Sequence, residues 1–204
     1  TANNLTIKLS NSGVKIFGTR AEDVDSAENR SKFSQVLDKL HIMQPAWQEF
    51  TNITDAKNFA LEVGYPVLVR PSYVLSGAAM KTVWSQVELK KFVSNATTVS
   101  PDHPVVITKF MLNALEVDVD GICDGKNVVV GAIVEHIESA GVHSGDAMMC
   151  IPPWRLSNKI IENILESTNR IAIEFSIKGP FNLQFLIKDD QAYVIELNIR
   201  ASRS

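Results

Sequence analysis

The 204-residue sequence has little cysteine, and its positive charges are not gathered in any one segment. The two cysteines, Cys123 and Cys150, form no C-x-x-C pair. Both lie among apolar residues, so we expect buried, reduced thiols rather than a disulfide or a zinc site. The net charge is -3 and the pI is near 5.8. These values give no electrostatic basis for a nucleic-acid or membrane partner, since both attract basic patches.

Long apolar runs, a signal-peptide layout, low-complexity tracts and internal repeats are also missing from the sequence. A membrane-spanning helix would need about twenty apolar residues. We therefore expect an intracellular protein, with the cytoplasm preferred over the mitochondrion. The sequence starts without Met and stops directly after a functional-looking motif. This predicts a fragment of a larger multidomain polypeptide.

Helix and strand signals are mixed along the chain without a strict alternating repeat, which predicts an α+β fold. Asp25 and Glu28 have the spacing of a capping box ahead of an apolar stripe from Phe33 to Leu40. A second helix is expected over 56–63, ending at Gly64. Ser157 is expected to cap a longer helix that ends near Phe175. Strands are predicted at 67–70, 105–108, 116–120, 128–134, 182–188 and 193–198.

The last two predicted strands carry oxygen-bearing side chains. Alternation puts Val194, Glu196 and Asn198 on one face, and Tyr193, Ile195 and Leu197 on the other. If 189–191 is a three-residue turn, Gln184 lies directly opposite Glu196. Oxygen ligands of this kind, followed by arginines, suit a Mg2+ ion that carries nucleotide phosphates. A solvated edge hairpin explains the same spacing equally well.

Three segments together identify a resemblance: Tyr65 to Ala79, Glu135 to Asp146, and Val194 to Ser204. In order and spacing they resemble the large subunit of carbamoyl-phosphate synthetase. The Ser-Tyr-Val-Leu stretch at 72–75 and the Gly-Val-His-Ser-Gly-Asp stretch at 141–146 resemble its second, C-terminal ATP-grasp half. The match runs from about residue 13 to the end.

The resemblance implies an ATP-grasp fold, in which two α+β lobes have the nucleotide site between them. It implies that 1–22 end a preceding α/β domain, that 23–112 form the helix and lid lobe, and that 113–204 form the second lobe with the metal-binding hairpin. The activity implied is the phosphorylation of carbamate by ATP, a step of pyrimidine and arginine or urea-cycle metabolism. The implied partners are the remaining synthetase domains and a glutamine amidotransferase or other ammonia source.

The resemblance also implies roles for individual residues. Gln184, Glu196 and Asn198 would bind Mg2+ or Mn2+. Arg200, Arg203 and His143 would act in catalysis. Carbamate is already an anion and needs no general base, so Arg200 and Arg203 would hold it for attack on the γ-phosphate. The residues implied in ATP binding are Arg30, Arg70, Lys109, Met111, Glu116, Gly141, Val142, His143, Ser144, Gln184 and Glu196.

Several alternatives stay open from the sequence. Arg70 ends an apolar strand and is equally compatible with a plain surface arginine. The segment 72–80 has one glycine, Gly77, and reads as a flap over phosphates or as an ordinary loop. Glu116, Asp118 and Asp120 share one strand face, and we interpret Asp118 as part of a solvated acidic stripe. A different ATP-grasp carboxylate-amine ligase, a biotin-dependent carboxylase and a non-catalytic nucleotide-binding module are the other candidate functions.

Overall fold

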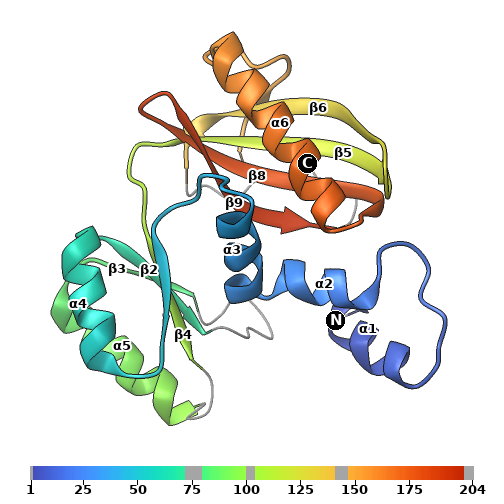
Figure 1. The fold of residues 1–204 in the computed structure, drawn as a ribbon. Helices are drawn as coiled ribbons and strands as arrows, with labels where there is room; N and C mark the ends of the chain where they lie inside the picture. The colour runs from blue at the N-terminus through green and yellow to red at the C-terminus, as the bar shows by residue number, and fades with distance from the viewer. Residues whose placement is uncertain (1, 72–79, 100–103, 141–146, 200–204) are drawn as a thin grey trace. The chain divides into compact units, whose positions relative to one another are not determined.

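The structure is a computed structural model that describes residues 2–71, 80–99, 104–140 and 147–199. The chain divides into two compact units (Figure 1). One unit comprises Thr1–Glu28, Gln35–Gln44 and Leu112–Ser204, and the other comprises Asn29–Ser34 and Pro45–Met111. We refer to them as the large unit and the small unit. No helix in the described part of the chain is long and apolar enough to cross a bilayer.

The small unit is built on a four-stranded antiparallel sheet with the strand order β1-β4-β2-β3. The strands are β1 (Trp47–Phe50), β2 (Val67–Pro71), β3 (Lys81–Val83) and β4 (Val105–Lys109). Helices α4 (Ile53–Val63) and α5 (Gln86–Val99) lie beside one another on the sheet (Figure 1). Their apolar faces and the strands form one core, which includes Ala60, Val67, Leu89 and Ile107.

The large unit is built on a five-stranded antiparallel sheet with the strand order β7-β6-β5-β8-β9. Its strands are β5 (Leu115–Asp124), β6 (Val128–Ser139), β7 (Met149–Cys150), β8 (Lys178–Lys188) and β9 (Gln191–Asn198). Helix α6 (Asn158–Glu174) runs across one face of this sheet (Figure 1). The antiparallel pairing throughout the described residues confirms the α+β prediction.

Local signals explain where the helices begin and end. Ser157 caps α6 by accepting a hydrogen bond from the Ile160 amide, and α4 stops at Gly64, whose φ of 74° suits glycine. Both features confirm the predictions. The capping box at Asp25 is wrong, because Asp25 and Glu28 lie inside α2 (Ala21–Glu28). Helix α3 (Arg30–Lys39) instead follows Asn29, whose Oδ1 accepts from the Lys32 amide at 3.0 Å.

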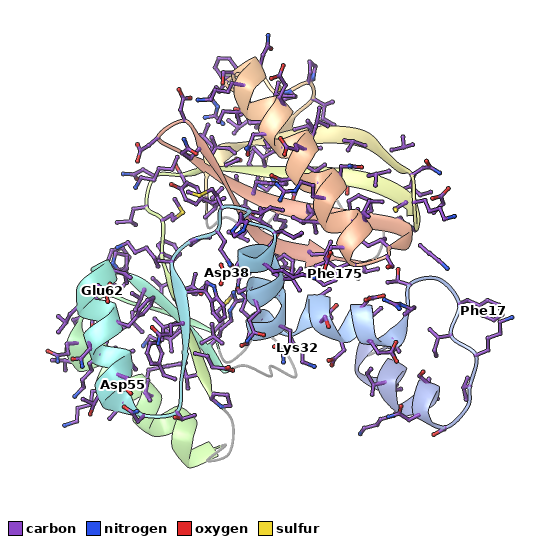
Figure 2. All side chains as sticks on the ribbon, in the orientation of Figure 1. Phe17, Lys32, Asp38, Asp55, Glu62 and Phe175 are labelled. Atoms are coloured by element: carbon purple, nitrogen blue, oxygen red, sulfur yellow. The ribbon has the colours of Figure 1, made fainter. Side chains whose placement is uncertain are left out.

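The N-terminal part of the large unit consists of α1 (Ala2–Asn11), a connection and α2. Figure 2 shows Phe17 pointing away from these helices, and 84% of its surface is exposed. The Lys15 ammonium lies 5.3 Å from the centroid of the Phe17 ring. The division of the chain at residues 22 and 112 stays a prediction.

Both cysteines are free thiols, as expected. Cys123 is buried on β5, but Cys150 on β7 is only half-buried. The prediction of two buried thiols is therefore wrong for Cys150, because β7 is the edge strand of its sheet and has a neighbour on one side only.

Candidate functional site

The face of the large unit's sheet that carries the polar residues can be read from the strand pairing. Asp118 on β5 pairs with Gln184 on β8, and Gln184 pairs with Glu196 on β9. In the next row, Asp120 pairs with Asn182, and Asn182 pairs with Asn198. Directly paired residues direct their side chains to the same face. Two neighbouring rows therefore present carboxylates and carboxamides together, and we call this surface the polar face.

The opposite face is apolar and fixes the orientation of the sheet. Val119, Leu183 and Leu197 form one of its rows, and all three are buried. Helix α6 packs on the sheet with Ile164 and Ile171 fully buried. A slip of one residue in any strand would exchange the two faces and bury the carboxylates under α6. The apolar rows thus hold the polar rows in register.

The β8–β9 hairpin reaches this register by an unexpected route. Lys188 pairs with Gln191, so the turn has two residues, Asp189 and Asp190, both with positive φ. The predicted three-residue turn is wrong. A register shift between Gln184 and Phe185 leaves Ile195 as an extra residue on β9. This bulge adds back the residue that the shorter turn removes, and Gln184 does lie opposite Glu196, as predicted.

The same bulge corrects the predicted faces of β9. Phe185 pairs with Val194 and Leu186 pairs with Tyr193. Val194 therefore lies on the apolar face, where it is fully buried, and not beside Glu196 as regular alternation predicted. Tyr193 lies on the polar face. Regular alternation fails here because a bulge inserts one residue between Val194 and Glu196.

Asp118 belongs to a buried pair rather than to a solvated stripe, so that interpretation is wrong. Asp118 Oδ2 lies 2.9 Å from Nε2 of His136 on β6, and both residues are 1% exposed. Strand β6 pairs with β5 on the side opposite to β8. Glu116 is also buried, with 8% of its surface exposed. The acidic residues Glu116 and Asp118 are thus removed from water.

Asp120, two residues further on, is only half-buried. Burial raises the pKa of its carboxyl group above the usual value, the hydrogen bond from Asn182 lowers it, and the nearby charge of Asp118 adds to the increase. Asn182 Nδ2 donates to Asp120 Oδ1 at 3.1 Å. Asp120 and Asn182 therefore already have a described partner in each other.

The donor set of the polar face fits a hard divalent cation. Gln184, Glu196 and Asn198 supply one carboxylate and two carboxamide oxygens, and Mg2+ prefers oxygen ligands with only one or two protein carboxylates. Among the described residues, no group of three or more His, Cys, Asp and Glu could hold a metal ion. Beside these ligands, Asp118 Oδ1 is buried and lacks a hydrogen-bond partner in the described part of the chain.

Four of the residues expected to bind ATP belong to the small unit: Arg30, Arg70, Lys109 and Met111. Arg30 is buried, and its guanidinium lies 5.7 Å from the centroid of the Phe33 ring. Lys109 ends β4, where its Nζ donates to the Gly64 carbonyl at 2.8 Å. Arg70 lies near the end of β2, paired with Val106 on β4. Their roles stay predictions.

Other expected site residues lie outside the described part of the chain. These are Gly141, Val142, His143, Ser144, Arg200 and Arg203, together with most of the expected phosphate flap, 72–79.

A second buried polar group lies on the other face of β6. Glu135 is fully buried and accepts hydrogen bonds from the Trp154 and Arg155 amides at 2.9 and 3.0 Å. The Arg155 guanidinium also donates to it. Burial alone would raise the pKa of Glu135, but these hydrogen bonds and the positive charge hold it below its usual value. The group ties the segment before α6 to β6.

No role was predicted for His136 or Glu135 from the sequence. A usable signal was present, because the Glu-His pair directly follows the predicted strand 128–134. Extending that strand by two residues places one ionisable side chain on each face of the sheet. One of them had to face the acidic side of β5.

Comparisons with known proteins agree on the family. The model of the family "Carbamoyl-phosphate synthase L chain, ATP binding domain" matches residues 29–204. The carbamoyl phosphate synthase large chain of Sulfurisphaera tokodaii is 51% identical over 202 residues, which cover 99% of this chain and 19% of that protein. The multifunctional protein pyr-3 of Neurospora crassa is 50% identical over 204 residues, covering all of this chain and 11% of that protein. The chain thus spans about a fifth or less of these relatives.

Solved structures agree on the fold. A biotin carboxylase from Campylobacter jejuni superimposes with a TM-score of 0.81 at 21% identity, covering 98% of this chain and 46% of that one. D-alanyl-alanine synthetase A from Vibrio cholerae gives a TM-score of 0.82 at 17% identity, and the match covers 97% of this chain and 63% of that one. At such identities the likeness shows the fold alone. The fold is ATP-grasp, as the sequence predicted.

Proposed function

Because this chain belongs to the family of carbamoyl-phosphate synthase L chain ATP-binding domains, we propose that it binds ATP with a divalent cation and phosphorylates carbamate to carbamoyl phosphate. We assign it to the second half of such a synthetase. The observation that carries the proposal is the row in which Gln184 lies opposite Glu196, with Asn198 in the next row of the same face.

Gln184, Glu196 and Asn198 would hold Mg2+ or Mn2+ on the polar face. When bound, the ion supplies positive charge to the ATP phosphates and offsets the charge that develops during phosphoryl transfer. Glu196 is exposed and Gln184 is partly exposed, so both are accessible to phosphate oxygens. Glu116 would accept hydrogen bonds from the ribose hydroxyls. Arg30, Arg70, Lys109, Met111 and the segment 141–144 would complete nucleotide binding.

The reaction needs no proton acceptor from the protein. A carbamate oxygen attacks the γ-phosphorus, the bond from that phosphorus to the β,γ-bridging oxygen breaks, and ADP leaves with the electron pair. Carbamate is an anion throughout, so the protein's part is to position it and to balance charge. Arg200 and Arg203 would bind the carbamate with their planar guanidinium groups, and His143 would contact the reacting phosphate.

The partners are part of the proposal. We expect the chain to work with the other domains found in its longer relatives and with a glutamine amidotransferase or another source of ammonia. We also propose a cytoplasmic location and a role in pyrimidine and arginine synthesis or in the urea cycle. A biotin-dependent carboxylase is not favoured, because relatives at 51% and 53% identity are carbamoyl phosphate synthase large chains.

The test is the reverse reaction, ATP formation from carbamoyl phosphate and ADP. We would measure it with this chain in place of the matching 202 residues of the Sulfurisphaera tokodaii protein. Glu196→Gln should lower the rate by about a hundredfold or more, because groups that stabilise developing charge contribute that much. Glu162→Gln, an exposed change on α6, is the matched control. An unchanged rate in Glu196→Gln would remove the metal assignment, and ATP binding without any turnover would indicate a non-catalytic nucleotide-binding module.

A further inference from the structure

We propose that Asp118 is a positioning residue that sets the orientation of the Gln184 carboxamide, so that its oxygen and not its NH2 group faces the bound cation. This inference rests on the proposed function, because it concerns the same metal site.

Only one of the two Asp118 carboxylate oxygens has a hydrogen-bond partner among the described residues. Oδ2 is taken by His136 at 2.9 Å. Oδ1 is buried, and no hydrogen bond reaches it from the residues that the structure describes. Leaving a buried carboxylate oxygen without a donor is costly, and such atoms in folded proteins nearly always have a partner. A donor for Oδ1 must therefore come from a side chain that can turn toward it, or from water.

The strand order identifies that donor. Strand β5 lies between β6 and β8, and His136 approaches Asp118 from β6. On the β8 side the residue directly paired with Asp118 is Gln184. Directly paired residues have Cα atoms about 4.5–5.5 Å apart. Gln184 Nε2 does not donate to Oδ1 in the conformation shown, but rotation of the Gln184 side chain would bring it within reach. Gln184 is also longer than Asn182, which already spans the neighbouring row to bond Asp120 at 3.1 Å.

A carboxamide has one accepting end and one donating end, and only its neighbours decide which end faces which way. Strand β8 lies between β5 and β9, so Gln184 has Asp118 on one side and Glu196 on the other. Once Nε2 turns to Asp118, Oε1 is directed toward Glu196 and the cation. In the reverse orientation, Oε1 would face a carboxylate and the NH2 group would face the cation.

The experiment measures binding of Mn2+ in the presence of ADP to the full chain, followed by the electron paramagnetic resonance signal of free Mn2+. Asp118→Asn keeps the shape of the side chain but supplies an NH2 group, which donates to Gln184 Oε1 and turns the amide the wrong way. We expect Mn2+ affinity to fall by about 10–100-fold, the usual effect of losing a residue that orients a metal ligand.

Exchanging the acid at position 118 with the amide at position 184 should restore the lost Mn2+ affinity. In the double variant Asp118→Asn with Gln184→Glu, the new amide at position 118 donates to one carboxylate oxygen at position 184, and the other oxygen faces the cation. Mn2+ affinity should return to within about threefold of the wild type, a difference of less than about 1 kcal/mol. Because an added carboxylate can by itself tighten cation binding, Gln184→Glu alone is measured as well. A merely structural role for Asp118 predicts that Gln184→Glu raises Mn2+ affinity by the same factor with Asp or Asn at position 118.

Asp120→Asn is the matched control. It removes the same charge from the same strand face, one row away from Gln184, and should leave Mn2+ affinity within about threefold of the wild type. Equal losses in Asp118→Asn and Asp120→Asn would show that negative charge alone matters and would overturn the inference. It is also overturned if Asp118→Asn binds Mn2+ as tightly as the wild type, or if the double variant binds no tighter than Asp118→Asn. The proposed function would fail together with the inference if the wild type binds no Mn2+ and Glu196→Gln leaves the rate of ATP formation from carbamoyl phosphate and ADP unchanged.

Discussion

Gly121 lies against the ring of Phe181 on the neighbouring strand β8, and its missing side chain is what allows the contact. A Cβ atom at Gly121 would lie 2.6 Å from Phe181 Cζ and 2.9 Å from Cε1. Phe181 is itself 1% exposed and packed in the core. The close approach places a large ring in the core beside the strand that carries Asp118 and Asp120.

We therefore expect Gly121→Ala to lower the free energy of unfolding by about 1–3 kcal/mol, the usual cost of overpacking a core. Urea denaturation followed by circular dichroism would measure it. Gly131→Ala on the paired strand β6 is the matched control, because the atom nearest to its Cβ would be the Asp120 carbonyl oxygen at an ordinary 3.6 Å. Equal stability of the two variants would show that the Phe181 ring moves without cost.

Individual residues also mark the limit of what the sequence predicts. Glu116 and Asp118 are both acidic and two positions apart, and alternation places both on one face. Whether that face is wet depends on β6, which brings His136 over Asp118. The pairing of β5 with β6 includes two register shifts, and no local pattern in the sequence of either strand predicts them. The burial of Asp118 thus depends on contacts between strands that the sequence alone does not specify.

The β8–β9 hairpin shows how a correct site can follow from an incorrect element. Gln184 lies opposite Glu196, as predicted, although both the turn and the regular alternation assumed for that prediction are wrong. The turn was not predictable, since Asp189-Asp190 lacks the glycine that usually marks a two-residue turn with positive φ. The bulge at Ile195 was also hidden, because the sequence of β9 alternates regularly on both sides of it. The two errors are each one residue long and opposite in sign, so they cancel at Gln184.

Strand β6 is tied to the segment before α6 by Glu135, which suggests a test of that connection. Glu135→Gln replaces a fully buried carboxylate that accepts from two backbone amides and from Arg155. Arg155 would then face an amide, and we expect a loss of about 3–5 kcal/mol at neutral pH, as for other broken buried ion pairs. Urea denaturation would measure the loss. Glu138→Gln on the same strand is the control, since Glu138 accepts a hydrogen bond from the Met148 amide and its replacement should cost about 1 kcal/mol or less.

The pH dependence of the stability provides a second test of the pair formed by Glu135 and Arg155. The pKa of Glu135 lies below its usual value of 4.5, so the folded state binds this proton less readily than the unfolded chain. Its contribution to stability is complete above that value and is lost as the pH falls through the lower, folded-state pKa. Wild-type stability should therefore decrease below pH 4.5 more steeply than that of Glu135→Gln. Parallel curves would show that the hydrogen bonds from Trp154 and Arg155 do not favour the ionised form.

The two units do not follow the order of the chain. Arg30 belongs to the small unit, although Thr1–Glu28 and Gln35–Gln44 on either side of it belong to the large unit. Helix α3 therefore contributes residues to both units. The sequence predicted the α+β class because helix caps and strand alternation are local signals, and its motifs predicted the ATP-grasp fold by resemblance. It could not predict an interleaved division, which depends on contacts between residues far apart in the chain.

The chain covers 19% of the length of its Sulfurisphaera tokodaii relative, so the other segments of that protein are absent when the chain is assayed alone. We therefore expect the 204-residue chain alone to form ATP from carbamoyl phosphate and ADP at least about a hundredfold more slowly than the same chain placed within that relative, since a misplacement of about 1 Å in a catalytic group has this effect. The comparison needs equal molar amounts of the two proteins and saturating Mg2+ and ADP. Glu196→Gln should lower the rate in both by about a hundredfold or more. Comparable rates would show that this chain needs nothing from the remainder of such a polypeptide to orient its substrates.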